Sequence, residues 1–213
     1  MWVRGRALRA MAERLPPSVV FQRGPRSARR IALTFDDGPS PLTRQYLDVL
    51  DRGGAKASFF VIGRNCEGRA PELEETVGRG HHLASHGFTH TPFPELGRRA
   101  LVDELARTEA LLPGHRGRLR MVRPPFGKMT PASLLRSYRA GYASAMWSFD
   151  PLDWDAASSR DVVRAVDPSK LRNGDIVLLH EARPTTLDAL PEILERLRDA
   201  RFELVTVTDL LQV

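Results

Sequence analysis

From residue 30 onward, short apolar runs rich in β-branched residues alternate with longer segments of helical periodicity. Ser40 followed by Pro41 predicts the start of the first helix, and Gly53-Gly54 predicts its end. Strands alternating with helices in this way predict a parallel-sheet α/β fold, either an open doubly wound sheet or a closed barrel. We predict seven strands, at residues 30–35, 57–62, 81–85, 118–122, 142–147, 175–180 and 201–206.

The positions of the polar residues favour the barrel. Five of the predicted strands are followed at their carboxyl ends by polar side chains, namely Asp36 and Asp37, His86 and His90, Arg123, Asp150 and Asp153, and His180. In a β/α barrel these ends converge on one cup that carries the chemistry, whereas an open sheet would spread them along a line. We therefore predict one catalytic domain over residues 29–213, folded as a distorted, TIM-like (β/α)7 barrel.

Basic residues are concentrated in the N-terminal segment and not in this domain. Residues 1–30 contain eight arginines and one acid, Glu13, whereas the other 183 residues carry 24 basic and 25 acidic groups. This distribution argues against a nucleic-acid groove in the core. We predict that residues 1–28 form a basic extension, which is either solvated or in contact with an anionic surface such as lipid, wall polymer or RNA.

The sequence gives little information about compartment. No apolar run approaches the ~20 residues of a membrane span, and arginines interrupt the N-terminus where a cleavable signal would need an apolar region. Cytoplasm and cell envelope both remain open, as does the oligomeric state. The single cysteine, Cys66, excludes an internal disulfide.

The adjacent carboxylates of Asp36 and Asp37 need a reason, because neighbouring charges repel. Asp-Asp-Gly-Pro could be a simple strand-ending turn. The alternative is a bound cation, for which Asp37, His86 and His90 would supply one oxygen and two nitrogens. The two histidines are spaced i, i+4, so a single helix-like turn places them on one side. Asp36 then remains free to take a proton from a water activated by the metal.

Hydrolysis of an amide or ester also needs a proton donor for the leaving group. His180, at the end of the apolar run "DIVLLH", is the candidate acid, and Asp153 would hold its tautomer. Arg123 is expected to pair with Asp36. The rigid Pro-Pro pair that follows Arg123 would present the backbone N–H of Phe126 as an oxyanion donor.

Five segments, "TFDDGPS", "SHGFTH", "RPPFG", "DPLDW" and "LLH", occur in the order of the five motifs of a known family. The chain resembles the polysaccharide deacetylases, the NodB-like domain of carbohydrate esterase family four, over about residues 30–210. The resemblance implies a distorted (β/α)7 barrel that holds a divalent metal, most often zinc, with cobalt, nickel or manganese as alternatives. It also implies removal of acetyl groups from N-acetylated or O-acetylated sugars.

By the same resemblance, each motif residue has an expected role. Trp154 and Leu178 would line the slot for the acetyl methyl group, beside the backbone of Phe126. The implied machinery consists of Asp36 as base, Asp37, His86 and His90 as metal ligands, Arg123 as the residue that orients the base, His180 as acid and Asp153 as its partner.

The chain departs from the family pattern in the second motif and at two further positions. Gly87 stands where the family usually has Ser or Thr, whose hydroxyl braces the metal loop, so we expect a looser loop and weaker metal binding here. Glu181 stands where Asp is more frequent, a difference for which the sequence offers no explanation. Phe126 replaces a frequent tyrosine, which matters little if only its backbone is used.

The leading hypothesis is therefore a metal-dependent deacetylase of a glycan such as peptidoglycan, chitooligosaccharide or poly-N-acetylglucosamine. Two alternatives remain: a deacylase of a small substrate on the same scaffold, and a non-catalytic glycan-binding homologue. The presence of both Asp36 and His180 argues against the last, because a degenerate homologue is expected to lose one of them.

Overall fold

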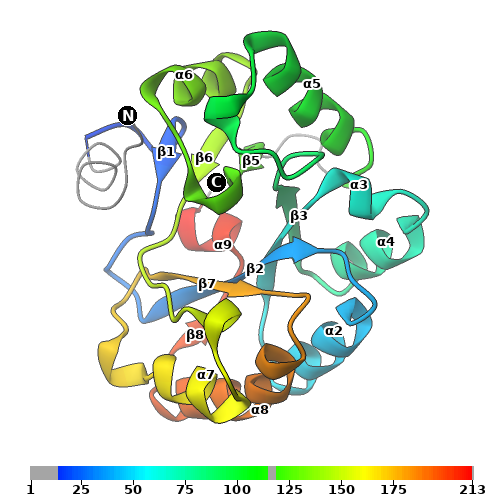
Figure 1. Ribbon diagram of the computed structural model, residues 1–213. Coiled ribbons are helices and arrows are strands. Elements are labelled where there is room, and N and C mark those ends of the chain that lie inside the picture. The colour runs from blue at the N-terminus through cyan, green and yellow to red at the C-terminus, as the bar shows by residue number, and fades with distance from the viewer. Residues whose placement is uncertain (1–13, 115–118, 213) are drawn as a thin grey trace.

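The computed structural model describes residues 14–114 and 119–212 (Figure 1). Its main sheet is parallel throughout, with strand order β1-β6-β5-β4-β3-β2-β7, while β8 pairs with β2 beside it. The strands are β1 (Val20–Phe21), β2 (Arg30–Gly38), β3 (Ala57–Val61), β4 (His82–Ser85), β5 (Met121–Val122), β6 (Ala143–Ala145), β7 (Ile176–His180) and β8 (Glu203–Leu204).

The two ends of this sheet approach each other without forming a regular ladder. The chain just after β1 meets the start of β7 through a bridge between Arg23 and Asp175, and Gly24 N donates to Gly174 O over 2.7 Å. The sheet is thus nearly closed, and the predicted distorted (β/α)7 barrel in a single domain is confirmed.

Helices cover the outside of the barrel, and one short helix, α9, lies within the ring of strands (Figure 1). Apolar side chains of α9 belong to the same buried cluster as Ala32 and Ile176, which face the barrel interior. The helices are α2 (Thr43–Arg52), α3 (Gly63–Cys66), α4 (Ala70–Gly78), α5 (Arg98–Glu109), α6 (Pro131–Arg139), α7 (Ser159–Ala165), α8 (Pro184–Asp199) and α9 (Val207–Leu211). Short 3-10 turns are η1 (Phe93–Glu95), η2 (Pro125–Gly127), η3 (Asp153–Asp155) and η4 (Pro168–Lys170).

The alternation of side chains along β2 separates the structural core from the functional interior. Ile31, Leu33 and Phe35 point outward, where they are buried with Leu47 of α2 and Leu190 of α8. Each such side chain contributes ~1.5–3 kcal/mol to stability through burial. The residues between them point into the barrel. The last of these inward residues, at the end of β2, lies in the cup formed by the carboxyl ends of the strands.

Two strands differ from the prediction. Val20–Phe21 is fully packed, at 0% and 3% exposure, and pairs with β6, although it lies inside the segment 1–28 that we predicted as an extension. A two-residue strand in an arginine-rich segment gives too short an apolar pattern to be identified. In contrast, only two residues of the predicted strand 201–206 pair with another strand. They form β8, which pairs with β2 outside the strand order of the main sheet.

The remainder of the predicted basic extension is not tested. Residues 1–13 lie outside the described residues, so a basic extension there and its contact with an anionic surface stay predictions. Among the described helices, none is long and apolar enough to cross a bilayer.

A hydroxyl residue followed by proline begins α6, but the start that we predicted for the first helix at Ser40 and Pro41 is wrong by two residues. Thr130 caps α6 in a capping box with Ser133, and Pro131 is the first helical residue. The first predicted helix instead begins at Thr43, because Ser40 and Pro41 form a turn in which Ser40 Oγ accepts a hydrogen bond from Leu42 N over 3.1 Å.

Candidate active site

A β-bulge at the end of β2 explains how two adjacent aspartates serve one site. Asp36 pairs with Phe60 and Gly38 pairs with Val61, so Asp37 is an extra residue in the ladder, with a φ of 72°. In a regular strand, successive side chains point to opposite faces, and Asp37 would face the helices. The bulge re-aims Asp37 toward the cup, and both carboxylates lie within 3.7 Å of His86 Nε2.

Asp37, His86 and His90 offer three donor atoms at the spacing of a metal site. Asp37 Oδ1 lies 3.3 Å from His90 Nε2 and 3.6 Å from His86 Nε2, and the two nitrogens are 3.3 Å apart. Donors held ~2.1 Å from a tetrahedral zinc ion would be ~3.4 Å from one another. Asp37 Oδ1 is buried and accepts no hydrogen bond from the described residues. The donor set therefore fits a divalent cation.

Burial keeps both imidazoles in the form that ligates metals. Desolvation lowers the pKa of His86 to about 3, despite the opposing charge of Asp37, and it also lowers the pKa of His90. Both rings are consequently neutral near pH 7. His86 Nδ1 donates to the carbonyl oxygen of Arg123 over 2.8 Å, which leaves Nε2 unprotonated and directed at the site.

Arg123 holds Asp36 from beneath the cup. Its Nη1 donates to Asp36 Oδ1 over 2.6 Å and to Thr34 Oγ1 over 2.8 Å, and its side chain is fully buried. Desolvation raises the pKa of Asp36, while the charge and hydrogen bond of Arg123 partly offset this rise. A carboxylate whose pKa is raised toward neutrality is a better proton acceptor than an exposed aspartate.

His180 lies beside Asp36 because β2 and β7 are register partners at these two residues. Asp153 of η3 accepts from His180 Nδ1 over 2.8 Å and from His180 N over 2.8 Å. Burial by itself lowers the pKa of His180, but the hydrogen bond and charge of Asp153 outweigh it, so the net pKa is raised. The Nδ1–H bond leaves Nε2 as the atom that exchanges a proton with a ligand.

The three predicted substrate-binding residues occupy different environments. Phe126 is 63% exposed, its ring centroid lies 4.5 Å from that of His90, and its N–H donates to no acceptor among the described residues. Leu178 is buried two residues before His180 and therefore shares its face of β7. Trp154 follows Asp153 in η3 and is 47% exposed. Their roles toward an acetyl group stay predictions.

Several residues that support the site were not identified from the sequence. Thr186 Oγ1 donates to Asp153 over 2.7 Å, and Asn65 Nδ2 donates to the carbonyl oxygen of Asp37 over 3.1 Å. Such hydroxyls and amides are too common in sequence to be singled out. Asp150, whose role the sequence left open, is a loop brace that accepts from Leu152 N over 3.0 Å.

Glu181, which stands where the family more often has Asp, also supports the site through its hydrogen bonds. The side chain is fully buried, and its Oε1 accepts from Ser40 N over 3.0 Å and from the hydroxyls of Ser40 and Thr43. Its own N–H donates to Asp36 O over 2.9 Å. Glu181 thus fastens the turn that follows the two aspartates.

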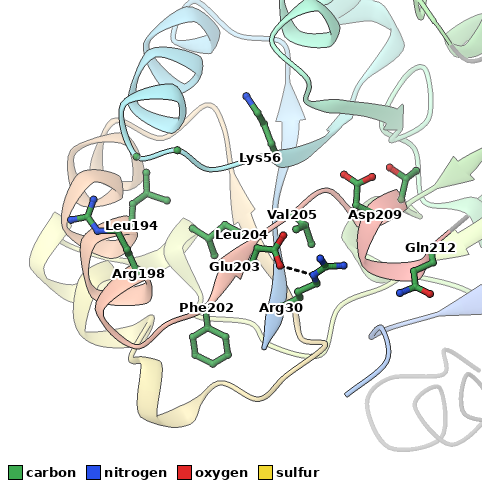
Figure 2. A pocket seen from close by; sticks show the side chains of 13 residues that line it. Arg30, Lys56, Leu194, Arg198, Phe202, Glu203, Leu204, Val205, Asp209 and Gln212 are labelled. Carbon is green, nitrogen blue, oxygen red and sulfur yellow. Dashed lines mark hydrogen bonds and ion pairs between the residues drawn. The ribbon is translucent and has the colours of Figure 1, made fainter. Parts of the chain in front are cut away.

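A separate cavity of about 860 Å³ lies away from these groups. It is lined by the start of β2, by α8 and by the C-terminal segment, and Figure 2 shows the ion pair of Arg30 with Glu203 at 2.6 Å within it. Arg30 precedes Asp36 by six strand residues, or ~20 Å. In β/α barrels this amino-terminal face serves stability and not chemistry.

The fold and the groups at the carboxyl ends of its strands have the arrangement expected of a β/α-barrel hydrolase. A family model described as polysaccharide deacetylase matches residues 23–145, and the chain belongs to this family. The resemblance seen in the five motifs is confirmed, and the protein is an enzyme of the polysaccharide deacetylase class.

Relatives that match most of the chain support this assignment. The chain is 36% identical over 160 residues to a chitooligosaccharide deacetylase of Sinorhizobium fredii, covering 74% of each protein. It is 31% identical over 203 residues to a peptidoglycan-N-acetylglucosamine deacetylase of Bacillus cereus, covering 92% of this chain and 95% of the relative. A crystal structure of a peptidoglycan N-acetylglucosamine deacetylase superposes with a TM-score of 0.85 at 25% identity, covering 92% and 94% of the two chains.

Proposed function

We propose that the protein hydrolyses the acetamido group of N-acetylglucosamine residues in a glycan, using a divalent cation bound by Asp37, His86 and His90. The observation that carries the proposal is the set of groups around His86 Nε2: His90 Nε2 lies 3.3 Å away, Asp37 Oδ1 3.6 Å and Asp36 Oδ2 3.7 Å. A binding protein for glycans would need neither the matched donor set nor the His180–Asp153 pair.

The cation would supply a Lewis acid for the acetyl carbonyl and would lower the pKa of the attacking water toward ~7. Zinc is the ion that an aspartate and two histidines suit best, and cobalt, nickel and manganese accept similar donors. Asp36 takes the proton from the attacking water. Arg123 fixes the Oδ1 atom of Asp36, so the Oδ2 atom, 3.7 Å from His86 Nε2, faces the site.

The two remaining groups complete the proton balance. The free N–H of Phe126 donates to the carbonyl oxygen as negative charge develops on it. His180 Nε2 gives its proton to the amine nitrogen as the C–N bond breaks, while Asp153 stabilises the imidazolium that exists before this step. The products are acetate and a glucosamine residue.

The substrate class is supported by what the two relatives share. One is named for chitooligosaccharides, which are oligomers of N-acetylglucosamine, and the other for the N-acetylglucosamine of peptidoglycan. Exposed Phe126 and Trp154 offer apolar faces on which a sugar ring can stack. The same scaffold could hydrolyse an O-acetyl ester, so the assay must distinguish N-acetyl from O-acetyl substrates.

The test measures acetate release by metal-stripped protein reloaded with zinc, cobalt, nickel or manganese. Substrates are N-acetylglucosamine oligomers, peptidoglycan fragments and acetylated xylan. We expect release from the first two with at least one ion, and a loss of about 10²-fold or more in Asp36→Asn and His180→Ala. Asp103→Asn, on the exposed face of α5, is the matched control and should keep parental activity.

Two results would contradict the proposal. The first is an absence of acetate release from every N-acetyl substrate with every ion. The second is full activity in Asp36→Asn, since the carboxylate is the only group assigned to accept the proton of water.

A further inference from the structure

The two histidines of the proposed metal site are held in different ways. His86 is fixed through its ring, because Nδ1 donates to Arg123 O over 2.8 Å. His90 has no such support: the only hydrogen-bond contact of its ring with the described residues is the 3.3 Å approach to His86 Nε2. The backbone of His90 also has a φ of 64°, a strained conformation for a side-chain-bearing residue. The conformation of the His90 backbone must therefore be maintained by contacts of the neighbouring loop residues and not by contacts of the His90 ring.

Glu104 of α5 provides that support. Its Oε2 accepts from Phe88 N over 2.6 Å and from Thr89 N over 2.8 Å, and its Oε1 accepts from Thr89 Oγ1 over 2.7 Å. The residue is 7% exposed, so these charge-assisted bonds are shielded from water. They grip the two residues directly before His90.

Gly87 explains why this support comes from a distant helix. Its φ is 79°, which glycine adopts without strain, and it carries no hydroxyl that could brace the loop from within. A Cβ atom at this position would lie 3.4 Å from Glu104 Oε2, at ordinary contact distance. We expected a loose loop because residue 87 has no hydroxyl. That expectation did not include the carboxylate of Glu104, which lies 17 residues further along the chain.

We infer that Glu104 is a positioning residue, which sets the metal affinity by holding His90 at ligand distance. This inference rests on the proposed metal site. Glu104 contacts neither the donor atoms nor a substrate, and acts through the backbone of Phe88 and Thr89. A residue needed only for the stability of α5 would not change the affinity of a folded protein for zinc.

The experiment measures the zinc Kd of metal-stripped full-length protein by competition with a chromogenic chelator, and urea unfolding without metal. Glu104→Ala should raise the Kd about 10- to 100-fold, the usual effect of losing an outer partner of a ligand. Glu104→Gln should stay within about threefold, because its oxygen can accept from both backbone N–H groups while its amide donates to Thr89 Oγ1. Asp103→Ala, on the exposed face of the same helix, is the control and should leave the Kd unchanged.

A second comparison separates positioning from stability. In a His90→Ala background, Glu104→Ala should change the Kd by less than about twofold, because the group through which it acts is gone. If Glu104→Ala does not fold, Thr89→Val removes one of the three hydrogen bonds and should raise the Kd about three- to tenfold.

The outcomes distinguish this inference from the proposed function. Parental protein that binds none of the four ions would overturn both. Parental protein that binds zinc, with a folded Glu104→Ala or Thr89→Val variant that binds equally tightly, would overturn only the role of Glu104. An equal loss of zinc affinity on Glu104→Ala in the parental and His90→Ala backgrounds would also overturn only the role of Glu104.

Discussion

Replacing Arg123 with methionine should cost a large part of the stability of the metal-free protein. The guanidinium is fully buried and donates to Asp36, to Thr34 and to the carbonyl oxygens of Ala145 and Met146. Methionine can fill much of the space beside Phe60, whose ring lies 3.9 Å from the guanidinium carbon. It leaves Asp36, which is 3% exposed, as a buried carboxylate without its hydrogen-bonded cationic partner.

Breaking a buried ion pair by removing one partner costs about 3–5 kcal/mol. We therefore expect Arg123→Met to lower the free energy of unfolding by about that amount at pH 7.5. This is a substantial fraction of the ~5–15 kcal/mol available to a typical domain. The double variant Arg123→Met/Asp36→Asn should recover at least about half of the loss, because the unpaired charge is gone while a carboxamide of the same shape remains.

The dependence on pH follows from the raised pKa of Asp36. A carboxyl group with a folded-state pKa above its unfolded value stabilises the fold below the unfolded pKa, and this contribution is lost as the pH rises through the folded pKa. Without Arg123, only the charge of His180 still opposes the effect of burial, so the pKa of Asp36 rises further. Arg123→Met should therefore regain stability relative to the parent as the pH falls from 7.5 to 5.5.

Urea unfolding of the three metal-free proteins at both pH values tests this reasoning. A loss below about 1 kcal/mol in Arg123→Met at pH 7.5 would refute it. So would a double variant no more stable than Arg123→Met, since the penalty would then not come from the charge of Asp36.

Three further predictions concern other parts of the site. Asp153→Asn removes the charge that raises the pKa of His180 against its burial, so the alkaline limb of the kcat–pH profile should move to lower pH; an unchanged limb would exclude His180 as the acid. Gly38→Ala should destabilise the protein by more than about 2 kcal/mol in thermal unfolding, because its Cβ would lie 1.8 Å from the buried Glu181 carboxylate, and a neutral effect would mean that this turn is free to move. Zinc at 100 times its Kd should stabilise the parent by about 2.7 kcal/mol in urea unfolding but Asp37→Ala much less, and equal stabilisation would locate the ion elsewhere.

Much of the architecture was predictable because it depends on local patterns. Alternation of apolar strands with amphipathic helices, and the hydroxyl-proline start at Thr130, depend on neighbours within a few residues. The polar residues at strand ends indicated one face, because parallel strands share the direction of their carboxyl ends. The strand Val20–Phe21 was missed, since its pairing with β6 depends on a segment more than 120 residues away.

The supporting shell of the site was not predictable for the same reason. Thr186 acts through one hydrogen bond to a residue 33 positions away in the chain, and Glu104 acts through three hydrogen bonds to residues 15 and 16 positions away. Nothing in a threonine or a glutamate on a helix indicates such a partner. The motif around Gly87 likewise gave no sign of the carboxylate that braces its loop, because that carboxylate comes from α5.

The amino-acid sequence is enough to identify the reactive groups and to place them at one end of a parallel sheet, because residue type and strand direction are local properties. Only the packing of distant segments turns Asp37 to the same side as Asp36 and places His180 beside Asp36. Those outcomes depend on a bulge, on strand register and on burial, which arise only when distant segments pack together.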